Sequence, residues 1–235
     1  MGDRPSIGKT ISSPVLIKLG GALLANPPMT LRVVAELVGL AKSGLRLLVL
    51  PGGGSLADQV RLLDQRYSFP DDLAHWLAID AMDLHARMLA GLAPRCRLVA
   101  TMVALDSAWL GRKVPVLMSR PLLESFPGLP ASWAVTSDSI ALHLAGALGC
   151  RRTVLVKMCR PGLGPGILTR GPGPWIEGGP LWEQMVDAHL PGLLRGLDHE
   201  LALCWADDLT GLSAAIRDTD DGSYLLVPGR PTVSF

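Results

Sequence analysis

The segment PVLIKLGG at residues 14–21 decides the fold class. It is a short aliphatic run that ends in two glycines, which is typical of a buried strand followed by a tight turn. The segment LRLLVLPGGG at residues 45–54 repeats the pattern. Between them, residues 30–42 carry apolar side chains at helical spacing, and Gly44 follows as a helix stop. Strands that are near-continuous apolar runs predict an α/β fold, with a parallel sheet covered on both faces.

The rest of the chain continues this alternation of strands and helices. We expect further strands at residues 98–103, 114–118, 153–156, 201–205 and 224–227. Helices are expected at residues 55–64, 71–92, 137–148 and 185–195. The glycine- and proline-rich run at residues 161–180 is expected to be an irregular connection.

Composition excludes several classes of protein. Of 235 residues, 49% are hydrophobic and 18% are charged, which argues against disorder. A formal net charge of +1 argues against a general nucleic-acid partner. Apolar stretches are interrupted before they reach the ~18–20 residues that span a bilayer, and the four cysteines form no CxxC pair. We therefore expect a cytoplasmic protein with neither a membrane partner nor a structural metal.

The two glycine runs lie where parallel sheets bind ligands, beyond the carboxyl ends of the strands. Backbone N–H groups of Gly20, Gly21 and Gly52–Gly54 could approach an anion closely there. Lys18 precedes the first pair, and we expect it at an exposed strand end that faces the same cleft. The pattern favours a phosphate cradle with two walls. The alternative is that the glycines only turn the chain between strand and helix.

A third segment, WAVTSDS at residues 133–139, leads into a helix. Asp138 falls in the first helical turn, with Thr136 or Ser137 as the N-cap. One interpretation is plain helix capping, because Ser, Thr and Asp are the residues that helix starts prefer. The other is that the Asp138 carboxylate holds the phosphate-binding lysine and helps to seat Mg²⁺.

These segments resemble the amino acid kinase family. The resemblance is carried by IKLGGALL at 17–24, LPGGGSLADQVR at 50–61 and TSDSIALHLA at 136–145. Further segments, AHWLAIDAMDLHARMLA at 74–90, LPASWAVTSDSIALHLA at 129–145 and VLVK at 154–157, resemble one branch of that family. This branch phosphorylates (5-(aminomethyl)furan-3-yl)methyl phosphate in methanofuran biosynthesis.

The resemblance implies a three-layer αβα sandwich with a mainly parallel central sheet. Residues 1–150 would form an acceptor-binding and dimerisation lobe, and residues 151–235 a divergent nucleotide-binding lobe, within one compact unit. The implied activity is that of a small-molecule kinase, which transfers the γ-phosphoryl of ATP to a phosphomonoester such as the aminomethylfuran-methyl phosphate. ATP would carry the Mg²⁺, without a side-chain metal motif. A homodimer or dimer-based oligomer is the implied assembly.

The resemblance also implies a role for each site residue. Lys18 and Asp138 would be catalytic, with Asp138 organising the lysine. Phosphate or nucleotide would contact Gly20, Gly21 and Lys157, and the last could instead be a solvated lysine at a strand end. The residues expected at the acceptor are Gly52, Gly53, Gly54, Ser55, Arg61 and Thr136. His75 could also contact the acceptor. The alternative, which the pattern favours for both His75 and Asp80, is a helix face packed against another subunit.

Two further features of the sequence bear on the assembly and on the activity. Leu73, Trp76, Leu77, Met88 and Leu89 are expected to form a broad apolar surface on the helix at 71–92, which favours a dimer. Where the family usually has an acidic Asp-Gly motif, residues 157–162 read KMCRPG. This departure keeps a second hypothesis open, that of a catalytically impaired member acting as a binding or regulatory subunit.

Overall fold

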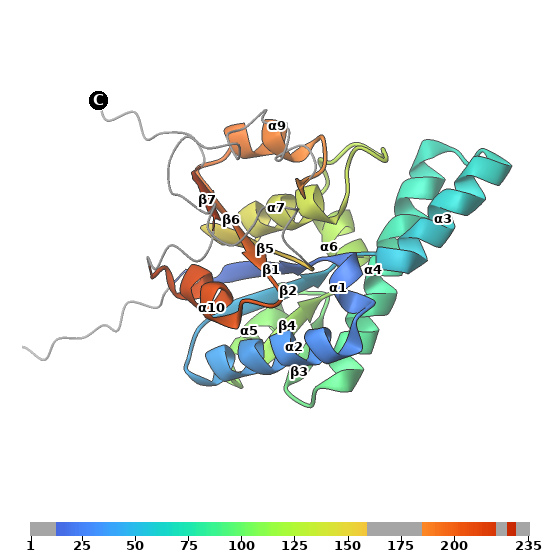
Figure 1. Cartoon of the computed structure of the whole chain (residues 1–235). Coiled ribbons are helices and arrows are strands. Elements are labelled where there is room, and N and C mark those ends of the chain that lie inside the picture. The colour runs from blue at the N-terminus through green and yellow to red at the C-terminus, as the bar shows by residue number, and fades with distance from the viewer. Residues whose placement is uncertain (1–12, 159–184, 220–224, 229–235) are drawn as a thin grey trace, which may run out of the picture.

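The structure is a computed structural model that describes residues 13–158, 185–219 and 225–228 (Figure 1). Seven strands form one sheet in the order β3-β4-β2-β1-β5-β6-β7. The strands are β1 (Val15–Leu19), β2 (Leu47–Pro51), β3 (Cys96–Val99), β4 (Val114–Leu117), β5 (Arg152–Lys157), β6 (Glu200–Trp205) and β7 (Leu225–Pro228). All neighbouring pairs are parallel except β6 and β7. The predicted α/β class with a mainly parallel sheet is confirmed.

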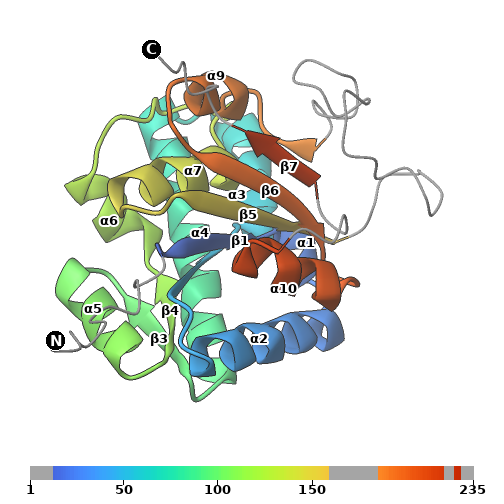
Figure 2. The same ribbon diagram turned by 90° about the vertical axis from the view of Figure 1, so that its left-hand side faces the viewer.

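Helices cover both faces of the sheet, giving three layers (Figure 2). One face is covered by α2 (Pro27–Lys42) and α10 (Leu209–Arg217), and the other by α5 (Met102–Leu110), α6 (Ser119–Ser125), α7 (Ser137–Ala147) and α9 (Leu190–Arg195). The short helix α1 (Gly21–Leu24) follows β1 directly. The hairpin of α3 (Gly54–Tyr67) and α4 (Asp71–Leu92) extends beyond the strand ends (Figure 1).

The core forms on both faces because the central strands carry apolar side chains on both of their sides. Ile17 and Val49 point into the layer that holds α2 and α10, whereas their neighbours Leu16 and Leu48 point into the layer that holds α7. All four side chains are at most 2% exposed. This two-sided burial is the reason that the strands read as continuous apolar runs.

Several helices were not predicted. The range 98–103 predicted for a strand is wrong beyond Val99, because β3 ends there and α5 begins directly after Thr101. The Thr101 side chain accepts a hydrogen bond from the Ala104 N–H, which is an N-cap signal. Asp208 caps α10 in the same way. The start of α6 is capped instead by Asp83 of α4, which is distant in sequence.

The C-terminal part of the chain also differs in detail from the prediction. The helix expected at 185–195 is limited to α9, since Asp187 occupies a turn before it. The last strand, β7, lies one residue beyond the expected range and is antiparallel. The expected irregular connection at 161–180 lies outside the described residues.

The sheet continues across the predicted boundary at residue 150. Strand β1 pairs with β2 on one side and with β5 on the other, in register from Val15–Arg152 to Leu19–Val156. The division into an acceptor lobe and a nucleotide lobe stays a prediction. Within the described ranges, no helix is both long enough and apolar enough to cross a membrane.

Candidate functional site

The two glycine loops contact each other at the carboxyl end of the sheet. A Cβ atom built on Gly21 would lie 2.3 Å from the Cα of Gly54, so neither loop has room for a side chain there. Gly54 has a φ of +50°, a conformation that glycine adopts without strain. Below the second loop, the buried His85 bonds through Nδ1 to the Gly52 carbonyl oxygen at 2.7 Å. The predicted pair of loops therefore forms a single backbone surface.

Not every predicted N–H group is available to a ligand. The Gly20 N–H donates to the Val156 carbonyl oxygen at 2.9 Å, and the Gly52 N–H donates to that of Leu19 at 2.8 Å. These two glycines close the turns, which corrects the expectation that their N–H groups hold phosphate. Gly21 and Gly54 begin α1 and α3, where N–H groups have no partner within their own helix. They remain the better candidates for binding an anion.

One carboxylate joins two lysines directly beside the loops. Asp138 Oδ1 lies 2.8 Å from Lys18 Nζ, and Asp138 Oδ2 lies 2.7 Å from Lys157 Nζ. Lys18 comes from the end of β1, Lys157 from the end of the adjacent β5, and Asp138 from the first turn of α7. The structure thus brings together the three charged residues that the sequence singled out. With two ammonium groups and one carboxylate, this triad carries one net positive charge.

The surroundings of the triad correct three expectations about its side chains. The side chains of Lys18 and Asp138 are each only 6% exposed, so Lys18 is not at an exposed strand end. Lys157 is an ion-paired lysine and not a solvated one, with 16% of its side chain exposed. Thr136 is the N-cap of α7, which leaves Asp138 as the counter-ion of two lysines rather than a cap.

The protonation states follow from burial and charge together. Burial would raise the pKa of Asp138, but the charges of Lys18 and Lys157 and their hydrogen bonds outweigh it and hold that pKa below its usual value. Burial lowers the pKa of Lys157, and the neighbouring Lys18 ammonium lowers it further. The Asp138 carboxylate acts in the opposite direction and raises the pKa of Lys157. Lys157 therefore loses its proton more readily than a free lysine does.

A pocket of about 280 Å³ opens next to the glycine loops, between α3, α4 and the start of α7. Its walls include Ile79, Met82 and Ile140, while Arg61 and His75 supply polar groups. The Arg61 guanidinium stacks 4.6 Å from the centre of the Trp133 ring. Trp133 is fixed in turn by a 2.7 Å hydrogen bond from Nε1 to Asp64.

The other predicted contact residues lie in different surroundings. Gly53, Gly54 and Thr136 line this pocket, whereas exposed Ser55 is not among the lining residues. Asp80 is not among the residues that line the pocket, and it forms a bidentate pair with Arg120 of α6 in the same chain. The Thr136 hydroxyl donates to Asp187.

The apolar surface expected on α4 is present in part, since Leu73 and Met88 are exposed by 43% and 39%. Leu89 is buried at 1% exposure and belongs to the core. Leu84, Met88 and Leu92 are exposed by 55%, 39% and 52%, and their spacing of four residues places them in one row along α4.

The glycine loops and the triad lie within the part of the chain that matches a known protein family. The model of the amino acid kinase family matches residues 13–160. The chain belongs to this family.

Relatives of this amino acid kinase family member include a [5-(aminomethyl)furan-3-yl]methyl phosphate kinase from Methanocaldococcus jannaschii. It is 27% identical over 140 residues, which cover 60% of this chain and 63% of the relative. The chain thus spans less than two thirds of the length of that relative.

Solved structures show the same fold. The UMP kinase from Ureaplasma parvum has a TM-score of 0.61 at 13% identity, covering 92% of this chain and 100% of that one. An aspartate kinase from Synechocystis has a TM-score of 0.65 at 14% identity, covering 95% of this chain and 41% of that one. At these identities the similarity concerns the fold alone.

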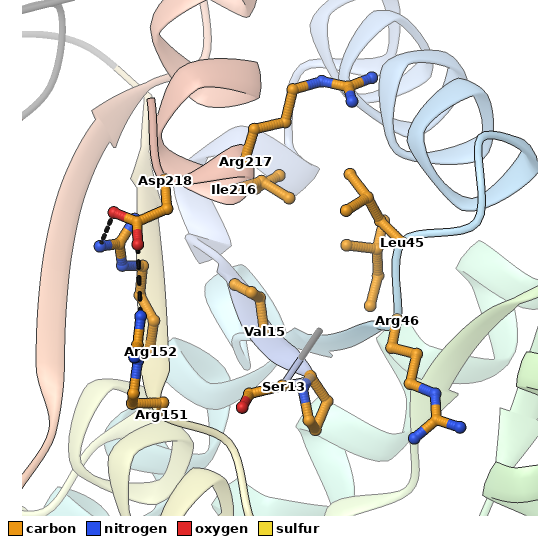
Figure 3. Close-up of a pocket in the computed structure, with 11 residues that line it drawn as sticks. Ser13, Val15, Leu45, Arg46, Arg151, Arg152, Ile216, Arg217 and Asp218 are labelled. Carbon is orange, nitrogen blue, oxygen red and sulfur yellow. Dashed lines mark hydrogen bonds and ion pairs between the residues drawn. The ribbon is translucent and has the colours of Figure 1, made fainter. Parts of the chain in front are cut away.

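A second cavity of this family member lies at the opposite end of the strands (Figure 3). Its volume is about 380 Å³, and residues at the amino ends of β1 and β5, among them Val15 and Arg152, line it. Arg152 is committed to ion pairs with Glu200 at 2.6 Å and Asp218 at 2.5 Å. This cavity is therefore separate from the glycine loops.

Sequence reasoning missed several residues that hold the site in place. No role was predicted for Trp133, which begins the segment WAVTSDS. An aromatic residue shortly before a ligand-binding turn is the sequence feature that could have indicated one. His85 and Asp64 gave no local signal, because their partners lie on other elements. Asp187 was read as part of a helix, although it is followed by Pro191 within a few residues.

Proposed function

We propose that this chain is a kinase that transfers the γ-phosphoryl group of MgATP to a small phosphomonoester. The observation that carries the proposal is the Lys18–Asp138–Lys157 triad, held within 2.8 Å contacts beside two glycine loops. Phosphoryl transfer needs little covalent chemistry from a protein. It needs reactants held in line and positive charge placed where negative charge develops.

The triad is suited to supply that charge. An ammonium group has three N–H donors, so each lysine can bind Asp138 and still donate to phosphate oxygens. Asp138 fixes both Nζ atoms before a ligand arrives, and preorganised charges of this kind lose little free energy to reorientation during the reaction. Gly21 and Gly54 would add backbone N–H groups from the adjoining loops. In this reading, an oxygen of the acceptor phosphate attacks the γ-phosphorus and ADP leaves.

The pocket beside the loops suggests the size and character of the acceptor. Its volume of about 280 Å³ is near the lower end of the ~300–1,000 Å³ range of small-molecule sites. Apolar walls suit a small ring, Arg61 suits an anionic group, and Asp58 at the rim suits a cationic one. An aminomethylfuran-methyl phosphate has these three parts. The name of the Methanocaldococcus jannaschii relative supports this acceptor.

Mg²⁺ would enter with the nucleotide and be held by its phosphate oxygens. Asp138 already contacts two ammonium groups, at 2.8 and 2.7 Å, so the proposal assigns it to the lysines and not to Mg²⁺. In the part of the chain that the structure describes, no cluster of His, Cys, Asp or Glu could hold a metal ion. Magnesium bound to the phosphates would neutralise charge there and leave the lysines to the transferring group.

The proposal is tested by calorimetry with MgATP and by ADP release over a panel of phosphomonoesters that includes aminomethylfuran-methyl phosphate. We expect heat of binding and acceptor-dependent ADP release. The variant Lys18→Met keeps most of the side-chain volume without its charge and serves as the matched inactive control. No binding heat at millimolar MgATP would overturn the kinase proposal.

A second candidate function is that of a binding or regulatory family member without catalysis. It is favoured by the end of β5, where Lys157 and the residues after it replace the acidic motif expected in the family. Binding of a phosphomonoester without binding of MgATP would support this candidate.

A further inference from the structure

Asp187 is the most heavily hydrogen-bonded carboxylate near the triad, and nothing above gives it a role in the chemistry. Its Oδ2 accepts hydrogen bonds from the Thr136 N–H at 2.9 Å, the Thr136 hydroxyl at 2.8 Å and the Ser139 N–H at 2.9 Å. Its Oδ1 accepts from the Ser139 hydroxyl and from the N–H groups of His189 and Leu190. Six donors therefore converge on one side chain.

This environment requires a hydrogen-bond acceptor at both side-chain oxygens. Four of the donors are backbone N–H groups, which cannot reverse their role, and they approach both oxygens. An Asn side chain would keep one acceptor oxygen and turn an NH₂ group toward the donors around the other. Hydrogen bonds to a carboxylate are stronger than those between neutral groups, so six of them favour one geometry.

The cluster connects two elements that are far apart in the sequence. Thr136 and Ser139 flank Asp138 at the start of α7, while His189 and Leu190 start α9. The first turn of α7 is therefore held on both sides of Asp138 by a residue that follows β5 in the chain. Helices α7 and α9 also share an apolar contact that includes Leu142, Leu190 and Leu194.

We propose that Asp187 is a positioning residue for phosphoryl transfer, which fixes the backbone around Asp138 and thereby the two lysines that Asp138 holds. This inference rests on the proposed function. Asp187 does not touch a reacting atom. It acts through the turn at 136–139 and through its negative charge beside Lys157.

The charge effect gives a readout that a purely structural role would not change. Among the residues that the structure describes, the charged groups that face Lys157 are Lys18 on β1, Asp138 on α7 and Asp187, while β6 presents Trp205 alongside it. Burial and Lys18 lower the pKa of Lys157, whereas Asp138 and Asp187 raise it. Removing the charge of Asp187 should therefore lower the pKa of Lys157 further.

The first test does not depend on activity. Acetylation of the full chain with acetic anhydride across a pH series, read by mass spectrometry, gives the pH at which Lys157 becomes reactive. We expect Asp187→Asn to move the Lys157 midpoint to lower pH. The control Asp198→Asn removes the same charge from an exposed position in the loop after α9 and should leave the midpoint unchanged. An unchanged Lys157 midpoint in Asp187→Asn would overturn the electrostatic part of the proposal.

The second test uses kinetics. We expect Asp187→Asn to lower kcat at least ~10-fold with a smaller change in KM, and to shift the alkaline limb of the pH profile to lower pH. Asp187→Glu retains the charge but displaces the oxygens, so it should lose kcat while keeping the wild-type limb. This variant carries the test if Asp187→Asn does not fold. Wild-type kcat in Asp187→Glu would overturn the positioning role.

The two proposals can fail separately. If the wild-type chain releases no ADP with any acceptor while the Lys157 midpoint still shifts in Asp187→Asn, the kinase proposal fails and the coupling stands. If the wild-type chain is active and both Asp187 variants match it, the kinase proposal stands and the role of Asp187 is refuted.

Discussion

The Cα atom of Gly54 occupies the space that a side chain on Gly21 would need, since a Cβ on Gly21 would lie only 2.3 Å away. Real Cβ atoms do not approach a backbone carbon this closely. The contact joins the turn after β1 to the turn after β2. These two turns must therefore move together, and the pocket beside them depends on glycine at both positions.

Gly21→Ala should reduce both stability and ligand binding, because the two loops would have to separate. We expect a loss of ~1–3 kcal/mol in the free energy of unfolding, as for other overpacked sites. Denaturant titration and phosphomonoester calorimetry measure the two effects. The matched control is Gly39→Ala in α2, where a Cβ meets no atom within 4 Å. That variant should gain ~0.5–1 kcal/mol, because alanine favours a helix more than glycine does. Equal stability of the two variants would contradict the steric argument.

Substitutions in the triad should separate charge from architecture. Lys18→Ala should lower turnover at least ~10²-fold, or about 2.7 kcal/mol of transition-state stabilisation. Its stability loss should stay below the ~3–5 kcal/mol of a broken buried pair, because Asp138 keeps Lys157 as a partner.

Asp138→Asn should destabilise the fold more than Lys18→Ala does, because it leaves two neighbouring ammonium groups without a counter-ion. This reverses the ranking expected for a helix cap, which Asn would serve nearly as well as Asp. Thermal unfolding and ADP release of the single and double variants test both points. The double variant should be less impaired than the product of the singles. A melting temperature of Asp138→Asn equal to that of the wild type would contradict the ion-pair reading.

Stability should fall in mild acid because of His199. This side chain is 3% exposed, and it pairs through Nε2 with the Thr153 hydroxyl at 2.8 Å. Burial lowers its pKa from 6.5 to about 4. Between pH 6.5 and about pH 4, His199 therefore binds a proton in the unfolded chain but not in the folded chain. The stability from neutral His199 is complete above pH 6.5 and is lost progressively toward pH 4, by ~3 kcal/mol at most.

Chemical denaturation of the wild type and His199→Gln across this pH range isolates the effect. Glutamine does not titrate, so the stability of the wild type should decline more steeply than that of the variant. Parallel curves for the two proteins would show that His199 does not contribute.

The exposed row of Leu84, Met88 and Leu92 on α4 should mediate self-association. An apolar row of this kind on a helix is commonly covered by a two-fold copy. Light scattering at micromolar concentration should give the mass of two chains or a multiple of it, and Leu84→Glu with Leu92→Glu should give the mass of one. A single-chain mass for the wild type would refute this prediction.

Features that depend on local sequence patterns were predicted, whereas contacts between distant segments were not. Strands β1, β2 and β5 were predicted because burial on both faces leaves an apolar run at each of them. Lys18, Asp138 and Lys157 were found because each stands next to a strand end or helix start with its own local pattern. The Lys18–Asp138 contact was one of two interpretations of the sequence, whereas the contact of Asp138 with Lys157 was not predicted, because it joins residues of two different elements.

The elements that were missed depend on partners from elsewhere in the fold. The start of α6 is capped by Asp83, and the turn at Asp187 is fixed by donors from α7, so neither has a complete local signature. The burial of Lys18 was also missed. A lysine at the end of an apolar strand gives no indication that a carboxylate from a distant helix will cover it.

The order of strands in the sheet divides the charges of the site between two parts of the polypeptide. Residues up to α7 contain Lys18 and Asp138, which together are neutral. The excess positive charge comes from Lys157, at the end of a strand that inserts beside β1 only after α7 has been made. During synthesis the first part of the chain can thus bury a balanced ion pair without holding an unpaired cation. The net positive charge of the triad therefore arises when β5 docks beside β1, before β6 and β7 extend the sheet.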